Sequence, residues 1–258
     1  MSASPSDPPV PELIAHRGFA ARYPENTRIA LRAALELGAP WVEFDVQLTA
    51  DGVPVLMHDA DLARTAGIAG NVLDMSLREL VGVHVGEPAR FGGRFSEPVP
   101  LLEDVVHLLS AYPGAKAFVE IKRASLRRFG VPRVLERVMR CLEPVTDRCA
   151  IISFEYHAAP QARQLGARAV GWVIDAWHER IRDAALKLAP EYLFVDHQLL
   201  PPVPEPLWPG PWRWAAYEVD DPALALALAA RGVGLVETMT IGAMLEDERL
   251  RKRTAIDR

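Results

Sequence analysis

The chain has 258 residues, of which 50% are hydrophobic, with 29 Lys and Arg against 34 Asp and Glu and a formal net charge of −5. This composition excludes a largely disordered chain. The basic residues are spread along the chain, which argues against a nucleic-acid-binding surface but leaves room for a small site that binds one phosphate. No apolar run approaches the roughly 20 residues that a membrane-spanning helix needs.

The N-terminal segment MSASPSDPPVPE lacks the charged and apolar regions of a signal peptide. We expect residues 1–12 to form a disordered tail. The two cysteines, Cys141 and Cys149, do not have the spacing of a metal or redox site. They indicate reduced, buried thiols in a cytoplasmic protein.

The first predicted elements form a strand–helix–strand unit. The apolar residues 13–15 predict a buried strand, and apolar side chains at helical spacing after Pro24 predict a helix that ends at Gly38. A second strand is predicted at residues 41–48. Residues 51–52 read Asp-Gly, which predicts a tight turn before an extended return.

Further along, residues 60–100 are rich in turn residues and are interpreted as an excursion at the strand ends. Helices and strands then alternate, and the predicted strands begin at residues 13, 41, 117, 150, 169, 192, 212 and 234. The prolines of residues 200–211 exclude a helix interior there. Eight alternating units predict one TIM-type (β/α)8 barrel domain over residues 13–258, with a Pro-rich crossing in place of the sixth helix.

Carboxylates mark the ends of two strands, which is where TIM barrels hold their active sites. Glu43 and Asp45 are two residues apart on a strand, so both point into the barrel mouth. An isolated pair of this kind is more often one exposed acid and one acid paired with lysine. Here the flanking residues are apolar, and buried like charges repel unless a cation lies between them. Glu120 adds a third carboxylate, and an oxygen-only set predicts Mg²⁺ or Ca²⁺.

Two histidines lie at strand ends. A lone histidine on an apolar strand is usually a core residue, but the pair His16 and His58, each followed by a polar residue, favours a general base and a general acid. Arg17 can bind two phosphate oxygens, and Lys122 adds a second positive charge. With three carboxylates and one divalent ion, these two residues leave one net positive charge, which matches a phosphodiester monoanion.

The segments IAHRG, PENT, VEFDVQLTADGVPVLMHD, LART, VPLLEDV and FVEIK, in this order, resemble the glycerophosphodiester phosphodiesterase family over residues 13–122. The resemblance implies a TIM barrel and a reaction in which a glycerol hydroxyl attacks phosphorus and water opens the cyclic product. It implies that His16 and His58 are the catalytic pair. It also implies that Glu43, Asp45 and Glu120 bind the metal, and that Arg17 and Lys122 bind the phosphate.

Two later strand ends depart from this family pattern. Residues 217–220 read YEVD where the family commonly has WTVN, and residues 237–239 read ETM where the family usually has Thr-Asp-x-Pro. Tyr217 and Trp172 are candidates for an aromatic wall of the substrate pocket. The added acids are expected to change the pocket for the alcohol.

The leading hypothesis is metal-dependent hydrolysis of a small-molecule glycerophosphodiester, such as glycerophosphocholine, to glycerol 3-phosphate and an alcohol. A phospholipase D-like activity on lysophospholipids is the alternative, with tryptophans lining an acyl-chain groove, namely Trp172, Trp177, Trp208, Trp212 and Trp214. A non-catalytic phosphate-ligand-binding barrel is a third hypothesis, and it would require the loss of a site residue. The oligomeric state, and the choice between Mg²⁺ and Ca²⁺, stay open.

Overall fold

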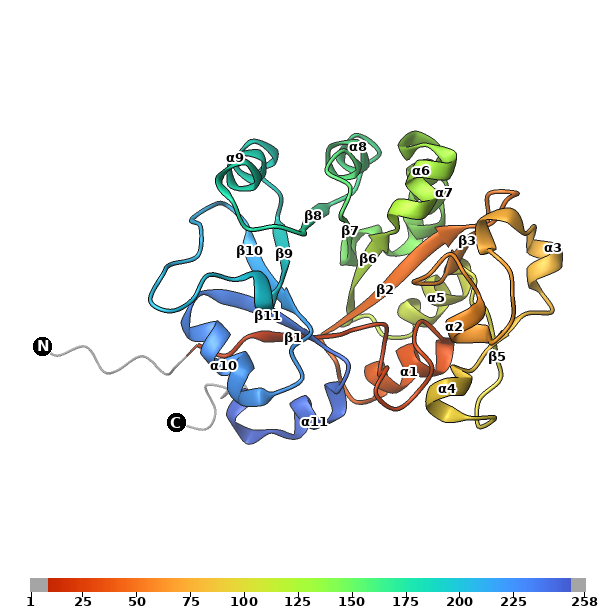
Figure 1. Cartoon of the computed structure of the whole chain (residues 1–258), viewed down its shortest axis with the longest axis horizontal. Helices are drawn as coiled ribbons and strands as arrows, with labels where there is room; N and C mark the ends of the chain where they lie inside the picture. Colours follow the sequence, from red (N-terminus) through yellow and green to blue (C-terminus); the bar gives the residue numbers. More distant parts are fainter. Residues whose placement is uncertain (1–8, 252–258) are drawn as a thin grey trace, which may run out of the picture.

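The structure, a computed structural model, describes residues 9–251, and its centre is a closed barrel of eight parallel strands surrounded by helices (Figure 1). The ring closes because the first strand pairs with both the second and the last. In ring order the strands are β1 (Glu12–Ala15), β2 (Trp41–Leu48), β6 (Lys116–Ile121), β7 (Cys149–Ser153), β8 (Ala169–Ile174), β9 (Tyr192–Asp196), β10 (Arg213–Tyr217) and β11 (Val233–Thr238). The predicted barrel is therefore confirmed. The predicted tail falls mostly on residues outside the described range.

The strands bury both of their faces, as parallel strands do when helices cover the sheet. Ile14, Phe118, Phe194 and Leu235 belong to a cluster that fills the inside of the barrel. Their sequence neighbours point outward, since side chains alternate along a strand, and pack in the larger cluster under the helices. Every residue of β2 is buried, so its carboxylates enter the protein interior.

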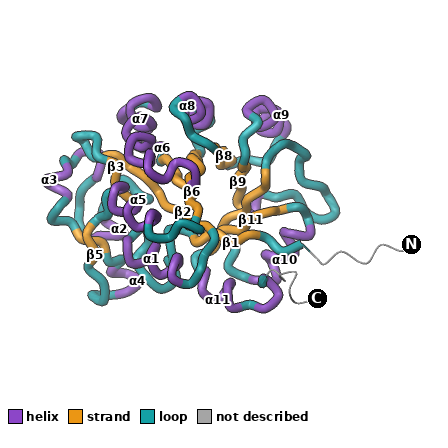
Figure 2. The backbone as a smooth tube through the Cα atoms, turned by 180° about the vertical axis from the view of Figure 1, so that it is seen from behind, coloured by secondary structure: helices purple, strands orange, loops and turns teal. Residues whose placement is uncertain are grey.

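Helices and connecting turns cover the outside of the barrel (Figure 2). The helices are α1 (Arg28–Glu36), α5 (Leu102–Ser110), α6 (Arg123–Phe129), α7 (Val131–Leu142), α8 (Ala158–Gln164), α9 (Glu179–Leu188), α10 (Pro222–Ala230) and α11 (Ile241–Glu246). The 3-10 turns are η1 (Val72–Asp74), η2 (Glu143–Arg148), η3 (His197–Leu199) and η4 (Glu248–Leu250). Among residues 9–251 no helix is both long and apolar enough to cross a bilayer.

The excursion follows β3 (Pro54–Leu56), which pairs antiparallel with β2. It contains α2 (Ala63–Ala66), α3 (Leu77–Leu80), α4 (Pro88–Phe91) and a two-stranded sheet of β4 (His84–Val85) and β5 (Glu97–Pro98). A separate apolar cluster stabilises it, with Leu62, Val72 and Val85 among its members. In Figure 1 these elements lie to the right of the barrel, beside α1 and the end of β2.

Between η3 and β10, residues 200–212 form no helix. Aromatic side chains pack there instead. The rings of Trp177 and Trp208 stack with their centroids 3.8 Å apart, and the Trp214 indole donates a hydrogen bond to the Trp208 carbonyl at 3.2 Å. Stacked indoles therefore cover the outer side of β10.

Candidate active site

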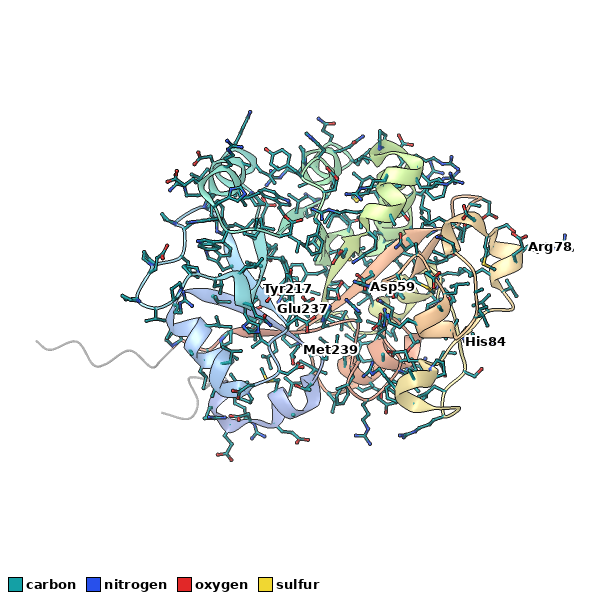
Figure 3. The ribbon with its side chains drawn as sticks, viewed as in Figure 1. Asp59, Arg78, His84, Tyr217, Glu237 and Met239 are labelled. Atoms are coloured by element: carbon teal, nitrogen blue, oxygen red, sulfur yellow. The ribbon has the colours of Figure 1, made fainter. Side chains whose placement is uncertain are left out.

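A pocket of about 280 Å³ opens at the carboxyl ends of the strands, as expected for a TIM barrel. Its polar lining comes from His16, Arg17, His58, Glu120, Lys122, Glu218 and Glu237. Phe154, Phe194 and Tyr217 form an aromatic part of its wall. Figure 3 shows Tyr217 and Glu237 near the centre of the barrel, with Asp59 on the side of the excursion.

Strand register brings the predicted metal ligands together. β2 and β6 pair in parallel with Asp45 opposite Glu120, and Glu43 lies two residues before Asp45 on the same face. One carboxylate oxygen from each of the three residues lies within 4.8 Å of the other two. Glu43 and Asp45 are each only 1% exposed, so water does not screen their charges.

These buried acids differ in charge state. Burial, followed by the charge of Asp45, raises the pKa of Glu43 well above its usual value. Burial also favours neutral Asp45, but Lys122 and Arg17 outweigh it and hold the pKa of that carboxyl far below its usual range. Lys122 Nζ lies 3.1 Å from Asp45 Oδ1, and Arg17 Nε lies 3.1 Å from Asp45 Oδ2.

The carboxylate group fits a hard divalent cation. Its donors are all oxygens, and Glu43 Oε1 is buried without a hydrogen-bond partner. A cation beside this atom would stabilise the ionised form that burial disfavours. Glu43, Asp45 and Glu120 are the residues that would hold it.

Asn26 orients one of these ligands directly. Its Nδ2 donates to Asp45 Oδ2 at 2.7 Å, and its Oδ1 accepts from the Asp45 backbone N–H at 3.0 Å. The N-cap of α1 is the next residue, Thr27, whose hydroxyl accepts from Ala30 N. Asn26 is thus free to hold the carboxylate.

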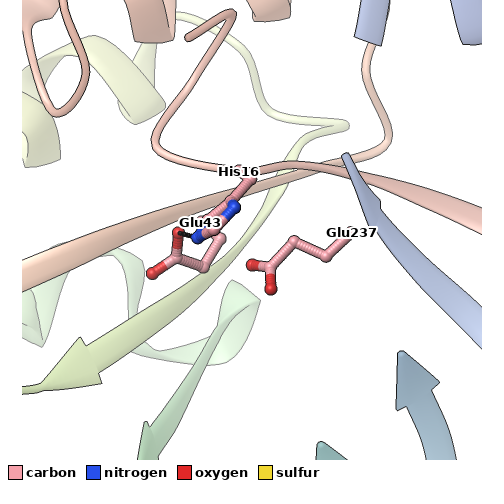
Figure 4. A group of neighbouring side chains, drawn as sticks. All are labelled: His16, Glu43 and Glu237. Atoms are coloured by element: carbon pink, nitrogen blue, oxygen red, sulfur yellow. Dashed lines mark ion pairs between the residues drawn. The ribbon is translucent and has the colours of Figure 1, made fainter. Parts of the chain in front are cut away.

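His16 lies at the base of the pocket, and Figure 4 shows it beside Glu43 and Glu237. Its Nε2 is 3.9 Å from Glu43 Oε2. Burial, followed by the charge of Arg17, lowers the pKa of His16 to about 3. The imidazole is therefore neutral at pH 7.

His58 faces the same pocket from the segment after β3. Its Nδ1 lies 2.7 Å from Asp59 Oδ1, which fixes one side of the ring. Burial is the largest of the effects that lower the pKa of His58 below 6.5. The two histidines predicted as a pair therefore line one pocket.

Arg17 reaches the pocket from a tight turn after β1. Its backbone has a φ of 53°, in the left-handed region, and its N–H donates to Glu43 Oε2 at 3.1 Å. Its guanidinium donates to Glu25 Oε1 at 3.1 Å. Opposite it, Lys122 Nζ donates to Glu120 Oε1 at 2.7 Å. Both predicted phosphate-binding residues therefore lie beside the predicted metal ligands.

The expectation that Trp172 lines the pocket is wrong. Its neighbour Val173 points inward, so the indole points out of the barrel, since residues alternate along a strand. The indole N–H donates to the Phe154 carbonyl at 3.3 Å, and the ring packs edge-on against Tyr156. The other tryptophans of the predicted acyl groove also lie in this outer layer.

Glu237 is a pocket residue that the sequence revealed only as a departure from the family pattern. It is 4% exposed, and its Oε1 has no hydrogen-bond partner. Burial, followed by the charge of Glu120, raises the pKa of Glu237 well above its usual value. Its place at the end of β11 was the available signal, because barrel strand ends face the active site.

Comparison with known proteins points to one family. The sequence profile of the glycerophosphoryl diester phosphodiesterase family matches residues 16–165. A glycerophosphodiester phosphodiesterase of Caldanaerobacter subterraneus subsp. tengcongensis is 32% identical over 200 residues, which cover 73% of this chain and 79% of that protein. One from Bacillus altitudinis is 35% identical over 147 residues, or 56% of this chain and 58% of the relative.

Solved structures share the fold. An Oleispira antarctica phosphodiesterase in complex with the product sn-glycerol-3-phosphate has a TM-score of 0.76 and 24% identity, covering 91% of this chain and 95% of that chain. A Parabacteroides distasonis glycerophosphodiester phosphodiesterase has a TM-score of 0.74 and 21% identity, covering 92% and 96%. Because the family profile spans more than half of the sequence, the chain belongs to the glycerophosphoryl diester phosphodiesterase family.

Proposed function

We propose that this protein hydrolyses glycerophosphodiesters to glycerol 3-phosphate and an alcohol, with a divalent cation and with His16 and His58 as the acid–base pair. Family membership supports the reaction class. The observation that carries the residue roles is a single pocket lined by both histidines, Arg17 and Lys122, beside the three-carboxylate group. This combination serves the hydrolysis of an anionic ester.

Arg17 and Lys122 bind the phosphodiester. Both side chains are 12% exposed, and each carries a charge that its acidic neighbours stabilise. A guanidinium offers two donors in one plane, whereas the ammonium adds a compact charge. A cation bound by Glu43, Asp45 and Glu120, either Mg²⁺ or Ca²⁺, would polarise a phosphoryl oxygen and neutralise the charge that grows on it.

The histidines move protons in both halves of the reaction. One imidazole takes the proton of the glycerol hydroxyl as this oxygen attacks phosphorus, and the other, charged beside the anionic phosphate, gives its proton to the departing alcohol. A cyclic phosphate results. In the second half the roles reverse: a water loses its proton as it attacks phosphorus, and the glycerol oxygen regains one.

The reaction is tested by measuring glycerol 3-phosphate release from a panel of glycerophosphodiesters with Mg²⁺, with Ca²⁺ and with a chelator. We expect activity with at least one cation and its loss on chelation. Full activity in the chelator would remove the cation from the proposal. Release of fatty-acyl glycerol phosphate from lysolipids at a higher rate would favour the phospholipase D-like alternative.

The acid–base pair is tested by substitution. His16→Ala and His58→Ala are each expected to lower kcat by about 100-fold or more, because each removes a proton-transfer group. The matched control is His107→Ala, an exposed histidine on α5. Near-wild-type turnover by either pocket variant would exclude that histidine from the chemistry.

A further inference from the structure

A buried carboxylate lies between two arginines at the edge of the pocket. Glu25 is 5% exposed and accepts two hydrogen bonds from Arg64, with Nη2 to Oε1 at 2.7 Å and Nη1 to Oε2 at 2.8 Å. Glu25 Oε1 also accepts from Arg17 Nη1 at 3.1 Å. A bidentate pair of this kind fixes both the distance and the plane of the two groups.

The remaining guanidinium nitrogen of Arg64 binds a second carboxylate. Nε donates to Asp59 Oδ2 at 2.6 Å, while Asp59 Oδ1 lies 2.7 Å from His58 Nδ1. Asp59 is therefore held between an arginine and a histidine, with one oxygen for each. Arg64 thus connects the residue that contacts His58 with the residue that contacts Arg17.

The excursion supplies the support for this arrangement. Glu87 Oε2 accepts from the Glu25 backbone N–H at 2.8 Å, and Glu87 Oε1 accepts from Arg90 Nη1 at 2.8 Å. The Glu87 backbone N–H in turn donates to the Thr65 carbonyl at 2.9 Å, next to Arg64. Glu25 and Arg64 are therefore anchored by the same short segment.

We propose that Arg64 is a positioning residue for the reaction. Through Asp59 it fixes the ring of His58, and through Glu25 it fixes the guanidinium of Arg17. This inference rests on the roles of His58 and Arg17 in the proposed function. His58 and Asp59 lie after β3, where no regular element holds them, and Arg64 supports them from α2 in the excursion.

The arrangement selects one tautomer of His58. Arg64 and His58 together hold the pKa of Asp59 below its usual value, although partial burial opposes them. Asp59 is therefore a carboxylate at neutral pH and only accepts hydrogen bonds. The neutral imidazole must then carry its hydrogen on Nδ1, which leaves the Nε2 lone pair free for proton transfer in the pocket.

The test that does not depend on turnover is ¹⁵N NMR of the histidine-labelled, cation-saturated protein at pH 8, with His58→Gln to identify the His58 signals. In the wild type we expect hydrogen on Nδ1. In Arg64→Met and Asp59→Asn we expect a mixture of tautomers. Arg90→Met is the matched control, because Arg90 is similarly exposed and pairs with Glu87 but contacts neither Asp59 nor Glu25. An unchanged tautomer in Arg64→Met would overturn the inference.

Kinetics test the same inference separately. We expect Arg64→Met to lower kcat/KM on the order of 100-fold, because small misplacement of reacting groups is costly. Arg64→Lys should recover only part of this loss, since one ammonium cannot bind two carboxylates in the same geometry. The double variant with Arg64→Met and Asp59→Asn should have a kcat/KM only slightly lower than that of Arg64→Met alone. If the losses of the two single variants multiplied in the double variant, the two residues would not share one role.

The outcomes separate the two proposals. If His58→Ala is inactive but Arg64→Met has the same kcat/KM and His58 tautomer as Arg90→Met, the proposed function stands. The positioning role of Arg64 is then overturned. A fully active His58→Ala overturns the proposed acid–base pair. In that case the NMR comparison still decides whether Arg64 fixes the ring.

Discussion

Asp45 and His16 show that burial acts on neighbouring side chains in opposite ways, depending on what surrounds them. Asp45 has Lys122, Arg17 and the Asn26 amide around it and remains a carboxylate inside the barrel. His16 has the positive charge of Arg17 beside it, and its Nδ1 is buried without a hydrogen-bond partner. The charge states of Asp45 and His16 therefore both depend on the charge of Arg17.

The lowered pKa of His16 has a consequence for stability. Burial and Arg17 lower this pKa from 6.5 to about 3, so between these values the unfolded chain binds a proton that the folded chain does not. The contribution of His16 to stability therefore falls as the pH falls below 6.5, by about 2 kcal/mol at pH 5.

Urea unfolding of the wild type and of His16→Gln at pH 7 and pH 5, in a chelator, measures this contribution. The wild type is expected to lose about 2 kcal/mol more than the variant over this interval. The other titrating groups occur in both proteins, so they cancel in the difference. Equal losses would mean that His16 is protonated in the folded protein near its ordinary pKa.

At the scale of elements, the turn between β1 and α1 positions the pocket residues His16 and Arg17. Arg17 and Gly18 both have positive φ angles, and the turn brings the backbone of Gly18 against that of α1. A Cβ on Gly18 would lie 2.5 Å from the carbonyl carbon of Ala30. The helix therefore packs closely against the residue that follows Arg17, and this position requires glycine.

Gly18→Ala is expected to lower the free energy of unfolding by roughly 2–5 kcal/mol, from a left-handed backbone and from the clash with α1. Gly38→Ala is the matched control: its φ is +84°, against +81° for Gly18, but a Cβ there meets nothing within 4 Å. Gly38→Ala should lower the free energy of unfolding by about 1–2 kcal/mol. Equal denaturation midpoints for the two variants would show that the contact with α1 is unimportant.

Elements differ in how far the sequence predicts them. The barrel strands were found because parallel strands are continuous apolar runs with alternating helices, and the Glu43–Asp45 spacing placed two carboxylates on one face of β2. Helix α6 was missed because only Ser125 and Leu126 of its short, arginine-rich sequence are buried. Whether the side chains of Glu237 and Trp172 line the pocket depends on which face of their strand meets it. The Arg64–Glu25 pair joins residues that are 39 positions apart in the sequence. Local patterns do not contain such information.

At the scale of the whole molecule, no α-helix lies between β9 and β10, and the stacked indoles of Trp177 and Trp208 cover that part of the surface. The indoles pack on Trp214 and on the apolar layer outside the strands. They do not line the pocket that contains His16 and His58. We therefore expect them to stabilise the fold without taking part in catalysis.

Trp208→Ala should lower the free energy of unfolding by roughly 3 kcal/mol, because it removes a large packed ring. The kcat of the folded variant should equal that of the wild type. Val203→Ala, in the same segment but 73% exposed, should change stability by less than about 0.5 kcal/mol. Thermal unfolding and turnover measured on the same samples check both statements, and a large fall in kcat for Trp208→Ala would assign the stack a role near the substrate.

Closure of the barrel by β1 and β11 also sets an order of events during synthesis. Ala15 pairs with Thr238, and the His16 backbone N–H donates to the Thr238 carbonyl at 2.9 Å. His16 directly follows β1, which is translated before the other barrel strands, yet β1 gains its second neighbour only when β11 has been made. A nascent chain that stops before β11 therefore holds His16 on an open edge, and the site is completed only after nearly all of the barrel has been translated.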